Sequence, residues 1–290
     1  MSRMPLIFLV DNGSLQPAAT LALRGLAANL SHRLGLTVEP VSLLHSYGID
    51  PKHLGGQAAE ILLPALEQRL AAGQNEFVIL PLFFGPSQAL TVYIPENVSR
   101  LRARYPAFNV RVAPPLHASG DDRLARILAD NVRTELEAPI VQHPPSSPRL
   151  RRDKNPAPQP VRVALVDHGS PVPEVTAVRN ELARQLLGLL GSSVAAVAPC
   201  SMERRPEPAY DFSSPLLSDL LVMPPWSASH VIVAMQFLLP GRHGGPDGDV
   251  ARICRQAEGA NPDLRTKITG LVSEHPLLVE ILVDRWRAVK

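Results

Sequence analysis

The chain has 290 residues, of which 45% are hydrophobic, so it is long enough for two domains that each bury a core. Its 29 basic and 27 acidic residues give a net charge of +2, which is too balanced to indicate nucleic-acid binding but permits a local basic pocket for an anionic ligand. Cys200 and Cys254 form no CxxC pair, and no apolar run reaches the length of a membrane span or a signal-peptide core, so we expect a cytoplasmic protein with reduced cysteines.

The first half alternates short apolar runs with longer segments of helical periodicity. The run at 6–10 predicts a buried strand, and the spacing of apolar residues over 17–35 predicts a helix. A weaker strand follows at 37–44, where Pro40 interrupts the pattern. Further strands are expected at 76–84 and 109–116, and further helices at 53–73, 94–106 and 120–136. This alternation is typical of a parallel sheet covered by helices on both faces.

The segment 138–160 has a different composition from the sequence on either side of it. It is rich in Pro, Ser and charged residues and shows no hydrophobic period, which predicts an extended linker. Its basic run "RLRRDK" is expected to be a solvated part of that linker rather than a nucleic-acid contact. We therefore divide the chain into a first domain over 1–137, a linker over 138–160 and a second domain over 161–290.

The second half repeats the order of the first. Strands are expected at 161–166, 193–199, 230–239 and 265–272, and helices at 174–191, 213–224, 249–259 and 275–289. The predicted fold is α/β, with two tandem flavodoxin-like domains that each hold a four-stranded parallel sheet flanked by helices.

One phrase occurs in both halves at the end of the first predicted strand. The N-terminal copy reads "VDNGS" and the later copy "VDHGS", so Asn12 and His168 lie 156 residues apart. The same offset places Ser87 on His243 in "LLPGRHGGPDGDVAR". In both motifs the second half has a histidine where the first has a small polar residue, which predicts a duplicated domain in which only one copy kept its site.

Three side chains of the second half are expected at one edge of its sheet. His168, Glu203 and His243 follow three successive strands, and ligands of open parallel sheets bind at the carboxyl ends of the strands. Two neutral imidazoles suit a divalent metal such as Co, Ni, Fe or Zn. Purely structural roles are the alternative for these residues, because a histidine after a strand often caps a loop and an exposed loop glutamate needs no functional explanation.

Other residues near these positions have weaker patterns. Gly241 and Gly244 allow a tight turn and close approach of a ligand to the backbone, and Asp247 and Asp249 are expected to cap the next helix. The arginines of this region are candidate partners for the carboxylates of an anionic substrate, although solvated arginines are an equal alternative: Arg204, Arg205 and Arg242.

The segments "LVDHGS", "SMERRP", "FLLPGRHGGPDGDV" and "SEHPLL" together resemble the sirohydrochlorin chelatase family, the small cofactor-free chelatases that include the cobaltochelatase of cobalamin biosynthesis. The resemblance is strong over 161–290 and weaker over 1–137. It implies tandem chelatase-like domains, in a monomer or homodimer, whose cleft takes an open anionic tetrapyrrole. It implies no organic cofactor. The balanced charge and the lack of a span-length apolar run lead us to expect no nucleic-acid or membrane partner. The divalent metal is a substrate, with Co2+ favoured and Fe2+ or Ni2+ as alternatives.

The resemblance also implies roles for individual residues. His168 and His243 bind the metal and accept protons from the pyrrole nitrogens, and Glu203 is a helper carboxylate. Asn12 and Ser87 cannot replace imidazole as metal ligands or bases, so we expect one site, with the first half as the other wall of the cleft. Within the first half His45 alone is left as a possible contributor; a partly buried loop histidine is the alternative.

Two other functions compete with a chelatase. A metal or tetrapyrrole carrier would bind through the same residues without turnover, and the altered first half favours it to some extent. A serine hydrolase would need a nucleophile elbow, and Ser170 in "DHGSP" does not lie in the GxSxG pattern.

Overall fold

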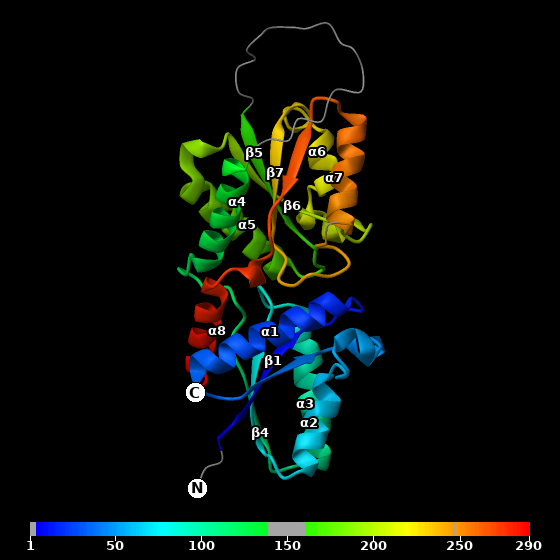
Figure 1. The fold of residues 1–290 in the computed structure, drawn as a ribbon, viewed down its shortest axis with the longest axis vertical. Coiled ribbons are helices and arrows are strands. Elements are labelled where there is room, and N and C mark those ends of the chain that lie inside the picture. The colour runs from blue at the N-terminus through cyan, green and yellow to red at the C-terminus, as the bar shows by residue number, and fades with distance from the viewer. Residues whose placement is uncertain (1–3, 139–159, 246) are drawn as a thin grey trace, which may run out of the picture.

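The computed structural model describes residues 4–138, 160–245 and 247–290, in which the chain forms two parallel sheets (Figure 1). The first sheet has the order β2-β1-β3-β4 and the second the order β6-β5-β7-β8. The strands of the first are β1 (Leu6–Asp11), β2 (Val38–Ser42), β3 (Glu76–Pro81) and β4 (Asn109–Val112). Those of the second are β5 (Val161–Asp167), β6 (Ala196–Ser201), β7 (His230–Met235) and β8 (Arg265–Ile268). The predicted α/β fold with two four-stranded parallel sheets is confirmed.

Helices cover both faces of each sheet, as the near-continuous apolar strands require. The first half contains α1 (Pro17–Leu34), α2 (Leu62–Ala71), α3 (Ile94–Arg104) and α4 (Arg123–Glu137). The second contains α5 (Pro173–Leu190), α6 (Leu217–Val222), α7 (Asp249–Ala260) and α8 (Leu277–Arg287). The segment 53–73 contains the expected helix, which begins only at Leu62, because Gly55 and Gly56 adopt φ values of 71° and 86° and Ile61 is extended and pairs with Ser42. None of the helices in the described ranges is long and apolar enough to cross a membrane.

The last helix of each half packs on the sheet of the other half. In Figure 1, α4 lies beside α5 against the second sheet, while α8 lies beside α1 against the first. Hydrogen bonds fix both exchanges: Lys267 Nζ donates to the carbonyl oxygens of Glu135 and Ala138, at 2.8 and 2.7 Å, and Arg285 donates to those of Pro115 and Leu116, at 2.9 and 2.7 Å. The two halves are therefore interlocked. The predicted linker lies outside the described residues except at its two ends.

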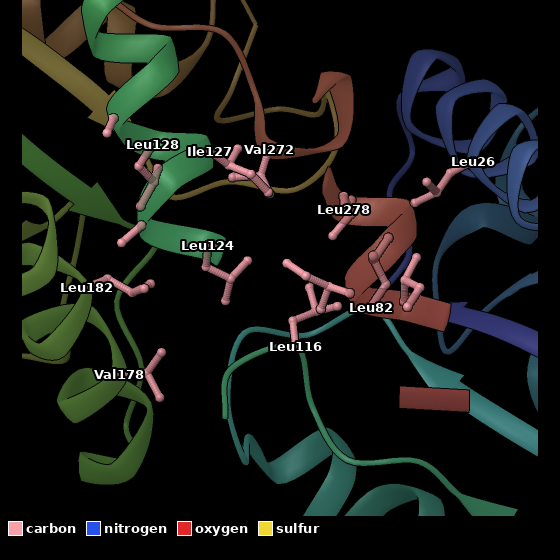
Figure 2. Packing of buried hydrophobic residues seen from close by; sticks show 14 of the residues in the cluster. Leu26, Leu82, Leu116, Leu124, Ile127, Leu128, Val178, Leu182, Val272 and Leu278 are labelled. Carbon is pink, nitrogen blue, oxygen red and sulfur yellow. The ribbon is translucent and has the colours of Figure 1, made fainter. Parts of the chain in front are cut away.

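One hydrophobic core spans both halves. In the view of Figure 2, Leu124 of α4 lies between Leu182 of α5 and Leu116 of the first half. These three side chains are at most 2% exposed, and Leu278 of α8 joins the same cluster. Separate clusters fill the outer faces, under α2 and α3 in the first half and under α6 and α7 in the second. The shared core fixes the two sheets relative to each other, which matters for a site between them.

The strand registers show how the repeat is built. Asp11 pairs with Ser42 as Asp167 pairs with Ser201, so the second strands are offset by 159 residues. Val10 pairs with Pro81 as Val166 pairs with Met235, which gives an offset of 154 at the third strands. The gapless offset of 156 residues is therefore wrong beyond the first strand. Loops of different length in the two halves change the offset from strand to strand. The internal repeat itself is present in both sheets.

Candidate functional site

The carboxyl ends of the two sheets face each other in the middle of the molecule (Figure 1). Loops from each half reach across this junction. A Cβ atom placed on Gly241 would lie 3.7 Å from Ser14 Oγ of the first half. One placed on Gly85 would lie 3.0 Å from Val178 Cγ2 of α5. The site of the second half is thus bordered by the first.

His168, His243 and Glu203 meet at this edge, as predicted from their positions after three strands. The two imidazole rings are arranged edge to face, with centroids 4.7 Å apart and planes inclined at 66°. The Glu203 carboxylate lies 3.5 Å from His168 Nε2. His168 and Glu203 are about half exposed, at 49% and 62%, while His243 is more enclosed at 28%. The three groups are therefore close to one another and accessible to a ligand.

Hydrogen bonds determine which nitrogen of each imidazole is free. His168 Nδ1 lies 3.1 Å from the carbonyl oxygen of Gly169, and His243 Nδ1 lies 2.5 Å from Asp249 Oδ2. Both partners are acceptors, so in each ring Nδ1 carries the proton and donates it. The Nε2 lone pair of each neutral histidine is then available for a metal or a proton. A carboxylate on the far side of an imidazole is the usual means of orienting a metal ligand.

The environment keeps His243 neutral. Burial lowers the pKa of His243 from its ordinary value of 6.5, and the neighbouring His168 and Arg242 act in the same direction, while Glu203 opposes them. A neutral imidazole at physiological pH binds metal without first losing a proton. The same lowered pKa makes it a weak base, so a proton that it accepts is readily passed to solvent.

The three residues line a pocket of about 410 Å³ whose lining residues all belong to the second half. Its wall combines apolar Met202 and Ile253 with charged groups from the start of α7. Asp249 accepts from the Arg252 guanidinium and lies 3.6 Å from Arg242 Nε, so it links both arginines to His243. Within the described ranges, no group of three or more His, Cys, Asp or Glu side chains is arranged to hold a metal ion.

A glycine allows the loops of His168 and Glu203 to pack closely. Gly169 has a φ of 96°, and a Cβ atom there would collide with the carbonyl oxygen of Glu203. The amide of Glu203 donates to the carbonyl oxygen of His168 at 3.2 Å, which ties the two residues through their backbones as well. In the "HGS" segment, Gly169 is therefore needed for the backbone conformation, in addition to the His168 side chain.

The other predicted site residues are placed differently. Arg242 lines the pocket and is 77% exposed. Arg204 lies 3.1 Å from Asp211, and Arg205 lies over the Tyr210 ring at 5.2 Å; neither lines the pocket. Gly241 and Gly244 lie on either side of Arg242 and His243 in the same turn and are likewise not part of the pocket wall. The role of these five residues toward a substrate remains a prediction.

The predicted capping role of Asp249 is wrong. Gly248 is the N-cap of α7, no side chain caps this helix, and the Asp249 carboxylate turns back to His243. The sequence did not identify Asp249 or Arg252 as site residues. An aspartate at the start of a helix is ordinarily explained by the helix dipole, and Arg252 lies within the same predicted helix. Only the six-residue separation of His243 and Asp249 within a glycine-rich turn hinted at their contact.

The first half has none of the three groups at the corresponding places. Asn12 stands for His168, and Leu44 stands for Glu203, since the amide of Leu44 donates to the carbonyl oxygen of Asn12 at 3.1 Å. The loop over 82–93 contains no His, Cys, Asp or Glu. It is one residue shorter than the 236–248 segment that carries His243, and the offset at the preceding strands is 154 residues, so Ser87 is not a register-matched counterpart. His45 lies one position beyond Leu44 and is exposed, with a φ of 65°, and its contribution remains a prediction.

Comparison with known proteins gives one family and a set of similar structures. The CbiX family model matches residues 6–135 and 162–289, that is, both halves. SirB from Bacillus subtilis with Fe3+ is 16% identical, with a TM-score of 0.68 over 99% of this chain and 96% of that one. The sirohydrochlorin chelatase SirB from Bacillus subtilis subspecies spizizenii, in complex with cobalt, is 16% identical with a TM-score of 0.67, over 99% and 95%.

A third similar structure is CbiX, described as the terminal enzyme for biosynthesis of siroheme in denitrifying bacteria. It is 13% identical, with a TM-score of 0.56 over 99% of this chain and 100% of that one. At these identities the likeness shows the shared fold. No match was found among curated proteins.

Proposed function

This chain belongs to the CbiX family, and from that membership and the geometry of the site we propose that it is a chelatase that inserts a divalent metal into sirohydrochlorin. The observation that carries the proposal is the edge-to-face pair of His168 and His243, 4.7 Å apart, in one pocket with Glu203. The similar SirB structures, described as bound to Fe3+ and to cobalt, support a metal substrate for this fold.

The metal is held by few protein ligands, as insertion requires. His168 and His243 present their Nε2 atoms, and imidazole favours borderline divalent metals, for which we propose Co2+ first and Fe2+ or Ni2+ as alternatives. Open coordination positions allow pyrrole nitrogens to bind the metal ion before the imidazoles dissociate from it. A site with a full set of protein ligands would retain the ion instead of transferring it.

Proton transfer accompanies insertion. Two pyrrole N–H protons must leave as the dication enters the macrocycle, and each needs an acceptor near its nitrogen. The Glu203 carboxylate, 3.5 Å from His168 Nε2, and the imidazoles released by the metal are the acceptors in the pocket. The remaining acceleration comes from holding metal and macrocycle in contact between two fixed walls.

Substrate recognition uses the charged rim. Sirohydrochlorin carries several carboxylates, and Arg242 and Arg252 border the pocket with exposed guanidinium groups, 77% and 56% exposed. Arg204 and Arg205 lie further along the same edge, and we propose that they reach the peripheral carboxylates. The first half supplies a wall without metal ligands, so we propose one site per chain.

The experiment that tests this function is an anaerobic insertion assay. Purified protein is mixed with sirohydrochlorin and Co2+, and the absorbance change is compared with the rate without protein and with the His168→Ala/His243→Ala variant. Multiple turnovers that disappear in the variant support the chelatase. Stoichiometric binding without acceleration would overturn it in favour of a metal or tetrapyrrole carrier.

A further inference from the structure

A buried arginine lies beneath the site of the second half. Arg179 is on α5 and is 1% exposed, although most arginines remain in water because burying an unpaired charge is costly. Each nitrogen of its guanidinium donates a hydrogen bond: Nη1 donates to Ser201 Oγ at 2.5 Å and to the Ser213 carbonyl oxygen at 2.9 Å. Nε and Nη2 donate to Asn180 Oδ1 at 3.1 and 3.0 Å.

These contacts reach both ends of the loop that carries His168. Ser201 Oγ accepts from Arg179 and donates to Asp167 Oδ1 at 2.6 Å, immediately before His168. Ser213, whose carbonyl oxygen binds Arg179, donates its own hydroxyl to the Ser170 carbonyl oxygen at 3.2 Å, immediately after Gly169. Arg179 therefore holds the segment on either side of the histidine through two serines.

The same contacts hold the chain that carries Glu203. Ser201 ends β6, two residues before Glu203. Arg179 Nη1 also lies 3.8 Å from Asp167 Oδ1, so the guanidinium charge faces the end of β5 as well as that of β6. The β5–β6 ladder already pairs Asp167 with Ser201, and the planar guanidinium adds contacts that restrain the segments leaving both strand ends.

The first half has no arginine at the corresponding position. Leu23 occupies the position of Arg179, since α1 and α5 start at Pro17 and Pro173 and have the same length of 18 residues. Leu23 is 2% exposed and packs in the shared core. The buried aspartate is retained as Asp11, and its Oδ1 atom is buried without a hydrogen-bond partner. The arginine thus occurs only in the half that has the histidines and the carboxylate.

We propose that Arg179 is a positioning residue for the metal site: it restrains the segments that carry His168 and Glu203, and it is absent from the half that lacks these side chains. Its effect on turnover rests on the function proposed above, whereas its effect on the two loops does not. Loss of a buried group that orients metal ligands typically lowers affinity or activity by about 10- to 100-fold.

The test compares Arg179→Leu, which reproduces the first half, with Arg179→Lys and with Arg285→Leu. Arg285 is a matched control, because it is also a buried arginine, 8% exposed, that donates to loop carbonyl oxygens, but it contacts the 115–121 segment rather than those of His168 or Glu203. Ser201→Ala removes the link to Asp167 with a smaller change, and it carries the test if Arg179→Leu does not fold.

Three measurements distinguish positioning from general stabilisation. Hydrogen exchange of the 167–170 and 201–205 segments should rise in Arg179→Leu and not in Arg285→Leu. The Kd for Co2+ alone should rise by about 10- to 100-fold in Arg179→Leu, with a smaller rise in Arg179→Lys. In the insertion assay kcat should fall by a similar factor, with KM for sirohydrochlorin changed by less than about threefold.

The outcomes separate the two proposals. If Arg179→Leu and Arg285→Leu lower the melting temperature equally and neither alters exchange in the two segments or Co2+ affinity, Arg179 is a structural residue and the inference is overturned. If exchange and Co2+ affinity change as expected but the unmodified protein shows no insertion, the positioning role stands and the proposed chelatase activity fails.

Discussion

Replacing Asp249 by alanine should impair the site without unfolding it. The carboxylate accepts a hydrogen bond from His243 Nδ1, with an N–O distance of 2.5 Å, and its side chain is 17% exposed, so it fixes both the tautomer and the orientation of the ring. A charge-assisted hydrogen bond of this kind contributes about 1.5–3 kcal/mol. Since 1.4 kcal/mol is a factor of ten, we expect Asp249→Ala to weaken Co2+ binding and lower kcat by about 10- to 100-fold.

The assay is a titration with Co2+ followed by steady-state insertion, with Asp247→Ala as the matched control. Asp247 is exposed, lies two residues away and does not line the pocket. Both variants lose one acidic residue near the start of α7; at about 2–4 °C per kcal/mol, loss of the Asp249 bond should lower the melting temperature by roughly 3–12 °C, and Asp247→Ala should change it less. Equal Co2+ affinity in the two variants would refute the orienting role of Asp249.

Further predictions concern the histidines, pH and the thiols. His168→Ala and His243→Ala should each lower turnover at least about tenfold, while Asn12→Ala and Ser87→Ala should change it little; equal losses would contradict a single site. Because burial lowers the pKa of His243 from its ordinary value of 6.5, Co2+ affinity should be nearly constant above pH 7, and protonation of His243 should weaken it only at a pH below that ordinary value; a steady rise between pH 7 and 9 would argue against neutral imidazole ligands. Burial raises the pKa of both cysteine thiols, that of Cys254 to about 12, so neither should react with Ellman's reagent at pH 8 until the protein is unfolded; rapid reaction of the native protein would contradict their burial.

The fold was predictable because its signals are local. Apolar runs such as that of β1 and the helical period of α1 are visible within a few residues, and their alternation indicates a parallel sheet. The exchange of α4 and α8 between the halves was not predictable in this way. An amphipathic helix such as α4 shows that one face is buried, but the sequence does not say which sheet buries it.

The site was predictable in part for a similar reason. Strand ends placed His168, Glu203 and His243 at one edge, and the edge-to-face contact of the histidines agrees with that placement. The contacts of Asp249 and Arg179 depend on loop paths and on the facing of a helix, which no period in the sequence encodes. Arg179 also looks like an ordinary exposed helix residue in "VRNEL", although it is buried.

Location of the metal tests the central claim most directly. Crystals of the protein soaked with Co2+ are measured at the cobalt absorption edge, and the anomalous map is compared at the two sheet edges. The account predicts one ion per chain, about 2.1 Å from the Nε2 atoms of His168 and His243, and none beside Asn12 and Leu44. An ion bound in the first half, or elsewhere with the histidine pair empty, would contradict the account.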